Sequence, residues 1–264
     1  MRSVADQVSR SDRKIQTVDV VHLAANRSPL KARVTFRWFF PVVSGVLLAA
    51  LVVGFAPSFF LRGHLSTPFP LPSMPGYLVV HGTVLTAWFL LVFVQACLVA
   101  SHRTDLHRRL GVAAVGVACF LVPISTFVVV RAVPRFISRG APRQALYGII
   151  LGDFLALFLF CLCVGAAVYV RHHRTDIHRR LMIVSCFVIF GPVLSRLESF
   201  YGLSFPFPIA IFVMLAGLAA YDLSTVRRIH LATVLAFGGA VFVGAVGAGL
   251  IATGAADALI DALR

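Results

Sequence analysis

Acidic residues are scarce in this chain. It has 10 Asp and Glu against 24 Lys and Arg, and only 13% of its 264 residues are charged. Soluble domains average about 25% charged and about 45–50% apolar residues, whereas 59% of this chain is hydrophobic and its mean hydropathy is +0.91. The shortage of charge excludes an ordinary soluble globule and predicts an integral membrane protein.

Sequence motifs of several soluble enzyme classes are also missing. No Walker loop, GxSxG elbow or Rossmann fingerprint occurs, so soluble-type catalysis has no support. No two cysteines have the CxxC spacing, and all five lie within apolar runs, which argues against a disulfide framework and a zinc site. These cysteines are Cys97, Cys119, Cys161, Cys163 and Cys186.

The formal net charge of +14 lies in short basic clusters between long apolar runs. Such clusters are typical of the cytoplasmic ends of membrane helices. We therefore expect the lipid bilayer and its anionic headgroups as partners, and no nucleic acid. Residues 1–37 carry eight basic residues without a long apolar stretch, and they predict a mobile cytoplasmic tail without a cleavable signal.

Seven segments meet the requirement of a spanning helix for about 20 mostly apolar residues. They are 38–60, 78–100, 110–131, 145–170, 180–200, 205–222 and 231–253. The predicted fold is all-α, a polytopic membrane helix bundle of about seven transmembrane helices over 38–253, followed by a short C-terminal tail at 254–264. In the last span, Ala240, Gly244 and Ala248 predict a face that packs inside the bundle.

The connecting segments divide the basic residues unequally. With the N-terminus inside, the cytoplasmic segments hold 17 Lys and Arg and the external ones hold six. This bias predicts a cytoplasmic N-terminus and an external C-terminus. The Arg-rich segment 131–143 departs from the bias, and we expect an interfacial segment there. The sequence leaves open both a homo-oligomer and association with another membrane protein.

One nine-residue motif occurs twice. It reads HRTDLHRRL at 102–110 and HRTDIHRRL at 173–181, with eight positions identical at an interval of 71 residues. Each copy joins two apolar spans, which predicts a duplicated helical hairpin made of helices 2–3 and 4–5. Matching hairpins around a pseudo-two-fold axis would bring the two copies close together.

Two interpretations of the repeated motif stay open. In the structural one, Asp105 and Asp176, or the threonine before each, cap the following helices, and the paired arginines anchor them at the headgroups. In the functional one, the histidines bind a metal or a haem, because anchoring does not require histidine. The candidate metal ligands are His102, His107, His172, His173 and His178. The candidate haem pairs are His102 with His173, or His107 with His178.

A second set of polar residues lies within the apolar spans. Ionisable residues there are rare and usually face the bundle interior or a cavity. One interpretation pairs Asp153 with Arg196 as a buried clamp, and the other makes these residues part of a pocket or proton path. The candidate ligand-binding residues are His81, Trp88, Gln95, Asp153, Arg196 and Glu198.

The segments HGTVLTAWF at 81–89, RTDLHRRLG at 103–111 and GPVLSRL at 191–197 resemble those of a widespread set of bacterial inner-membrane proteins. The resemblance covers about 38–250 and implies a seven-helix protein of the bacterial inner membrane, without implying an activity. More distantly, His-Arg-x-Leu at a helix start is similar to membrane haem proteins of the cytochrome b561 type. This similarity implies haem b as a candidate cofactor.

Three functions remain open for such a sequence. The protein is predicted to bind haem or take part in redox chemistry through the paired histidine-rich turns. Alternatively, it is a transporter or small-ligand-binding protein with a pocket around His81, Asp153 and Arg196. The H-x4-H spacing within each copy of the motif also suits a membrane non-haem iron oxygenase. No catalytic residue can be identified from the sequence.

Overall fold

The computed structural model describes residues 37–204 and 206–263, so the predicted tail over 1–37 lies almost entirely outside the described residues. The helix bundle belongs to the compact unit Phe40–Arg264. All regular structure in the described residues is helical, which confirms the all-α prediction.

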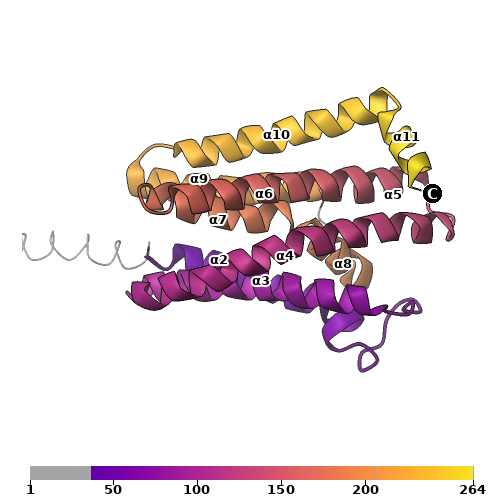
Figure 1. Cartoon of the computed structure of the whole chain (residues 1–264), viewed down its shortest axis with the longest axis horizontal. Helices are drawn as coiled ribbons and strands as arrows, with labels where there is room; N and C mark the ends of the chain where they lie inside the picture. The colour runs from indigo at the N-terminus through magenta and orange to yellow at the C-terminus, as the bar shows by residue number, and fades with distance from the viewer. Residues whose placement is uncertain (1–36, 205, 264) are drawn as a thin grey trace, which may run out of the picture. The chain divides into compact units, whose positions relative to one another are not determined.

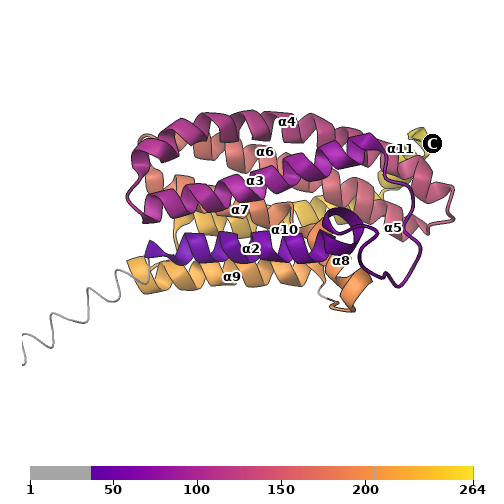
Figure 2. The ribbon, with the colours of Figure 1, turned by 90° about the horizontal axis from the view of Figure 1, so that it is seen from below.

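Six helical segments are long and apolar enough to cross a membrane, and a bent pair forms a seventh if it is counted as one span (Figures 1 and 2). The protein is therefore a polytopic helix bundle. The segments are α2 (Phe39–Phe55) with the π-helical turn η1 (Ala56–Phe60), α3 (Gly76–Ala100), α4 (Thr104–Ile137), α5 (Arg143–Tyr147) with η2 (Gly148–Gly152) and α6 (Asp153–Val170), the pair α7 (Thr175–Val188) and α8 (Gly191–Tyr201), α9 (Phe207–Val226) and α10 (Leu231–Ala252).

The helices run back and forth between two ends of the bundle. At the end that lies on the left in Figure 1, short turns at 101–103, 171–174 and 227–230 join α3 to α4, α6 to α7 and α9 to α10. We call this the histidine-loop end, because both copies of the repeated motif lie there. The opposite end, with the Pro-rich loop 61–75, is called the proline-loop end.

The fifth predicted span, 180–200, is not one helix. It consists of α7 and α8, which meet at a bend of 42°. The physical reason is Pro192, which follows the break, lacks a backbone N–H and sterically opposes the carbonyl four residues earlier in a continuous helix. α8 therefore begins at Gly191, with Pro192 in its first turn where proline is tolerated.

Aromatic contacts join the two hairpins in the bundle core. The Trp88 side chain on α3 is fully buried and packs edge-on against Phe160 of α6, with ring centroids 5.0 Å apart. Phe89 likewise lies near Phe190, at the α7–α8 break, at 6.2 Å. Trp88, predicted as a ligand-binding residue, is therefore a core residue in this structure.

The small residues of α10 face a different direction from the one predicted. Gly244 and Ala248 are exposed, and a methyl group added to Gly244 would meet nothing within 4 Å. The face toward α6 is instead formed by Gly239 and Gly247, where added methyl groups would lie 3.7 and 3.6 Å from leucine side chains of that helix. The prediction that the Ala240–Gly244–Ala248 face packs inside the bundle is thus wrong. Small residues occur on more than one face of this helix, and their spacing does not show which face packs against a neighbour.

The Arg-rich segment 131–143 is largely helical. α4 extends to Ile137 and α5 begins at Arg143, so only 138–142 lies between two helices, and the interfacial position of the segment stays a prediction. Arg135 donates a hydrogen bond to the Tyr77 hydroxyl at 2.6 Å, and its guanidinium lies 5.9 Å from the centre of that ring. These contacts bind the end of α4 to the start of α3.

The residues after 253, expected as a tail, include the short helix α11 (Ala255–Ala262). Its Ile260 packs with Val133, Leu146 and Ile150 in a buried apolar cluster. On the surface, Arg143 forms ion pairs with Asp257 and Asp261, and Tyr147 donates a hydrogen bond to Asp257 at 2.8 Å. α11 is therefore fastened to α4 and α5 at the proline-loop end.

The attachment of α11 is expected to depend on pH through Asp257. The hydrogen bond from Tyr147 and the pairing with Arg143 lower the pKa of this carboxyl below its ordinary value. A lowered folded-state pKa stabilises the packed helix above the unfolded value of about 4, and this stabilisation is lost as pH falls through the folded-state pKa. The protection of the α11 amides against hydrogen exchange, measured relative to the intrinsic rate at each pH, should therefore fall in acid, and in Asp257→Asn this dependence should be much reduced.

Candidate functional site

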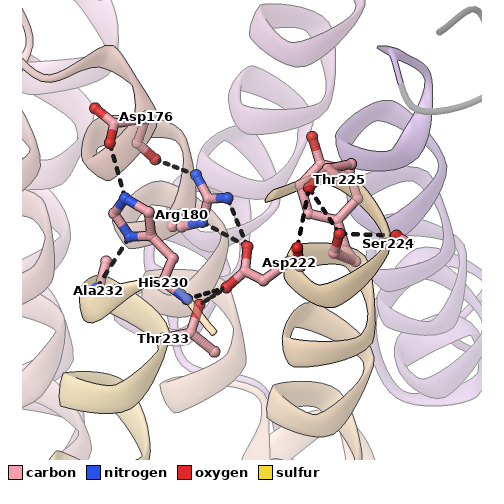
Figure 3. A network of polar contacts seen from close by, with 9 residues as sticks. Asp176, Arg180, Asp222, Ser224, Thr225, His230, Ala232 and Thr233 are labelled. Carbon is pink, nitrogen blue, oxygen red and sulfur yellow. Dashed lines mark hydrogen bonds and ion pairs between the residues drawn. The ribbon is translucent and has the colours of Figure 1, made fainter. Parts of the chain in front are cut away.

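A buried ion pair lies at the histidine-loop end. The side chains of Arg180 on α7 and Asp222 on α9 are 1% and 0% exposed. The Nε and Nη2 groups of Arg180 donate to the same oxygen, Oδ1 of Asp222, at 2.9 and 2.5 Å (Figure 3). Because an unpaired buried charge is very costly, each of these two groups requires the other.

The second carboxylate oxygen of Asp222 organises the turn into α10. It accepts hydrogen bonds from the backbone N–H of His230 at 3.0 Å and from the Thr233 hydroxyl at 2.6 Å. Asp222 lies in the penultimate turn of α9, whereas His230 and Thr233 flank the start of α10. One carboxylate thus binds the guanidinium from α7 and closes the connection between α9 and α10.

His230 links the same turn back to α7. Its Nδ1 accepts a hydrogen bond from the backbone N–H of Ala232 at 3.1 Å, which caps α10. The proton of the neutral ring therefore lies on Nε2, which donates to Oδ2 of Asp176 at 2.7 Å. Arg180 also donates to the backbone carbonyl of Asp176 at 2.7 Å, so the first turn of α7 is held from two sides.

These contacts correct the structural interpretation of the repeated motif. Neither Asp105 nor Asp176 caps its helix: the capping positions are the preceding Arg103 and Arg174, and neither makes a side-chain capping bond. Each aspartate lies one residue inside its helix, and Asp176 is directed to His230. Arg180 does not anchor a helix at the headgroups, because Asp222 holds it inside the bundle.

Two predicted histidines from different copies of the motif meet at this end. His107 near the start of α4 and His178 near the start of α7 have ring centroids 6.4 Å apart, with ring planes at 86°. His178 donates from Nδ1 to the backbone carbonyl of Ala167 at 2.9 Å, which leaves its Nε2 unprotonated in the neutral ring. The structure thereby brings together one of the two predicted pairs.

Unsatisfied polar atoms occur around His107. Its Nδ1 and the Oε1 of Gln95 are both buried without a hydrogen-bond partner among the described residues. A methyl group on Gly111, one helical turn after His107, would lie 3.6 Å from the Gln95 amide nitrogen. Buried polar groups without partners are uncommon and call for an explanation, such as a bound ligand, ion or water.

The remaining motif histidines are exposed. His102, His172 and His173 are exposed on the two turns, and His102 adopts a left-handed backbone conformation with φ of 60°. Over residues 37–204 and 206–263, no three or more His, Cys, Asp or Glu side chains are arranged to hold a metal ion. The five-histidine metal site is therefore without geometric support in the described residues.

The second set of predicted residues is spread over several contacts. His81 lies 3.4 Å from the Ser125 hydroxyl, and Glu198 accepts a hydrogen bond from Ser204 at 3.0 Å. Arg196 stacks over the Phe55 ring at 5.7 Å instead of pairing with Asp153. The predicted Asp153–Arg196 clamp is wrong, because the bend before α8 directs that helix toward α2, where Tyr201 also bonds the Val53 carbonyl at 2.9 Å.

Asp153 stands out among these residues. It is half-buried at the start of α6, directly after the π-helical turn η2, and no hydrogen bond or ion pair joins it to another described residue. π-helical turns are rare and occur frequently at functional sites. Asp153 therefore remains a candidate for binding a proton or cation.

Asp222 and His230 bind residues of the repeated motif but were not predicted from the sequence as its partners. Asp222 lies at the end of an apolar run, so the rule that flagged Asp153 and Arg196 applies to it equally. The burial of Arg180 could also have been predicted, because Arg180 is spaced from Val184 and Phe187 so that all three share the buried face of α7. That Arg180 and Asp222 pair with each other could not be predicted, because no local sequence pattern connects residues so far apart in the chain.

Comparison with protein-family models, with curated proteins and with solved structures yields no match.

Removing the buried ion pair should strongly destabilise the protein. Arg180→Met leaves the Asp222 carboxylate buried without its guanidinium, and a loss of about 3–5 kcal/mol in the free energy of unfolding is expected. Arg108→Met, which removes an exposed arginine from the other copy of the motif, should change it by less than about 0.5 kcal/mol. Thermal unfolding in detergent micelles measures both, and equal stability of the two variants would contradict the assignment.

Proposed function

We propose that this integral membrane protein binds haem, with His107 and His178 as the two axial ligands. The observation that carries the proposal is the meeting of these two imidazoles, which come from matching positions of the repeated motif on α4 and α7. Haem needs only two protein ligands, because the porphyrin supplies the other four nitrogens. A pair of histidines without a third ligand therefore favours haem over a non-haem iron centre, whose sites use three or more protein ligands.

The residues present fit such a group in spacing and in hydrogen bonding. The ring centroids of His107 and His178 lie 6.4 Å apart, and imidazole nitrogens lie about 2 Å from a bound metal, so both rings would be within reach of one iron. Metal-bound histidines usually donate their other ring N–H to a carbonyl or carboxylate. His178 makes such a bond to Ala167. Nδ1 of His107 has no hydrogen-bond partner among the described residues, so it would be free to bind the iron.

Bound haem would supply one-electron transfer, at a potential set by its two histidines and by its burial. The chain's own part is to hold and orient the ligands. The Ala167 carbonyl fixes the tautomer and the ring plane of His178. The Arg180–Asp222 pair and the Asp176–His230 hydrogen bond hold the first turn of α7, from which His178 projects.

We also propose the orientation that the basic residues predict. The histidine-loop end would face the cytoplasm of a bacterial inner membrane, with the proline-loop end and α11 outside. The paired histidines would then lie near the cytoplasmic surface. Electron exchange with a cytoplasmic donor or acceptor would follow from that position.

The test is an absorption spectrum of the full-length protein, expressed with added haem precursor and purified in detergent. A Soret band that shifts on dithionite reduction is expected. His107→Ala and His178→Ala should each lower the haem-to-protein ratio at least about tenfold, since loss of one axial ligand removes half of the metal–protein bonds.

Matched controls come from the same two turns. His102→Ala and His173→Ala remove exposed histidines of the same motif copies, and both variants should keep the wild-type spectrum. A colourless wild-type protein from haem-sufficient cells refutes the proposal. Equal haem loss in all four variants would show that the spectrum does not depend on the His107–His178 pair.

The second candidate function is transport of a proton or a small cation, and Asp153 favours it. A carboxylate inside a span that has no partner among the described residues, and the broken span α7–α8, are both features of membrane transporters, in which interrupted helices form binding sites. In proteoliposomes, Asp153→Asn should then abolish a pH-gradient-driven flux while leaving the thermal unfolding temperature unchanged. A flux that persists in Asp153→Asn, or the absence of any flux in wild type, would contradict this function.

A further inference from the structure

An exposed arginine at the histidine-loop end is held between two aromatic rings. The guanidinium of Arg179 on α7 lies 5.3 Å from the centre of the Phe40 ring on α2 and 6.0 Å from that of the Tyr221 ring on α9. The two rings also contact each other edge-to-face, with centroids 5.2 Å apart. We call Phe40, Arg179 and Tyr221 the arginine–aromatic cluster. It joins the start of α2 to α7 and to the last turns of α9.

The contacts with the rings leave the hydrogen-bond donors of Arg179 available. A guanidinium carries five N–H donors, and its attraction to aromatic rings consumes none of them. Over 37–204 and 206–263, no hydrogen bond or ion pair joins the Arg179 side chain to another residue. The rings also restrict the side chain, so less conformational entropy is lost when a ligand binds. Arg179 is therefore a preorganised cation with unused donors.

The carboxylates of the histidine-loop end do not neutralise Arg179. In the described part of the chain, each carboxylate at this end already pairs with another arginine. These carboxylates are Asp105, Asp176 and Asp222. Arg227 and Arg228, exposed directly after α9, add further positive charge at the same end. Such an excess of one sign of charge attracts an anion from outside the chain.

The first copy of the repeated motif provides a direct comparison. Arg108 lies 71 residues before Arg179 and is also exposed. Its Nε donates to the carbonyl of Thr104 in its own helix, at 3.4 Å. No aromatic ring of the described residues lies over its guanidinium, whereas α2 and α9 bring two rings to Arg179. The same position of the motif is thus preorganised in the second copy and not in the first.

We propose that Arg179 binds the phosphate group of one anionic phospholipid at the arginine–aromatic cluster. The planar fork of a guanidinium matches the geometry of phosphate oxygens, to which it can donate two parallel hydrogen bonds. α2 and α9 are both long and apolar enough to cross a membrane, so their ends lie at the depth of the lipid headgroups. A headgroup therefore reaches Arg179 while its acyl chains stay in the bilayer core. Free phosphate has the same chemistry, and the experiment separates the two sources.

The experiment measures lipid binding to the full-length protein by native mass spectrometry, with phosphatidylglycerol and phosphatidylcholine of identical acyl chains. Wild type is expected to retain one phosphatidylglycerol per chain in preference to phosphatidylcholine. Arg179→Gln should lower the affinity for phosphatidylglycerol about tenfold, because the charge-assisted hydrogen bonds to phosphate are lost. Arg179→Lys should lower it less, because lysine keeps the charge but not the planar fork. Phe40→Leu should weaken binding without removing any charge.

The matched control is Arg108→Gln, which removes the same charge from the corresponding position of the first copy. Its affinity for phosphatidylglycerol should stay within about twofold of wild type, because that arginine has no aromatic clamp. Thermal unfolding in phosphatidylcholine should be alike for wild type and both glutamine variants, since both arginines are exposed. Added phosphatidylglycerol should raise the unfolding temperature of wild type and Arg108→Gln, but not that of Arg179→Gln.

Three outcomes would overturn the proposal. Wild type without a preference for phosphatidylglycerol would have no such site. Equal loss of the lipid in Arg179→Gln and Arg108→Gln would show that binding follows total charge. Submillimolar binding of inorganic phosphate to wild type in phosphatidylcholine, abolished by Arg179→Gln, would identify free phosphate as the ligand instead. None of these measurements involves haem, so this proposal and the haem proposal fail separately.

Discussion

The buried ion pair between Arg180 and Asp222 is the interaction on which the histidine-loop end depends. Two charges removed from water are tolerable only when they meet with good geometry and their remaining hydrogen-bonding capacity is satisfied. Here the guanidinium bonds Asp222 and the Asp176 carbonyl, and the carboxylate also bonds the start of α10. Three helices, α7, α9 and α10, are thereby fixed relative to one another by a single pair of side chains.

The position of His178 depends on this arrangement. It lies two residues before Arg180, in the turn of α7 that the ion pair and the Asp176–His230 bond hold in place. On the other side, Gln95 on α3 and His107 on α4 each have a buried polar atom without a hydrogen-bond partner among the described residues. The haem proposal rests on this pair: the His178 ring is hydrogen-bonded to Ala167, and the neighbouring His107 ring has one nitrogen without a partner among the described residues.

The two copies of the repeated motif make different contacts in the structure. In the second copy, Arg180 binds Asp222 of α9 and Asp176 binds His230 at the start of α10. In the first copy, the corresponding Arg109 and Asp105 are exposed. The C-terminal helices make the difference, because α9 and α10 pack against α7, whereas the main neighbours of α4 are α3, α6 and η2. The histidines of the two copies nevertheless meet, because α4 and α7 both begin at the same end of the bundle.

Much of the fold was accessible from the sequence, because hydropathy and helix length depend only on local composition. The seven apolar segments, the helical class and the pairing of His107 with His178 as one of two options follow from runs and spacings within the chain. The break at Pro192 also had a local cause. Other features required the tertiary structure: that Arg180 is buried while Arg109 is exposed, that Asp153 and Arg196 do not pair, and that α11 packs on α5. Each of these depends on which distant helix lies alongside, and a buried charge acquires its role from that neighbour rather than from its own motif.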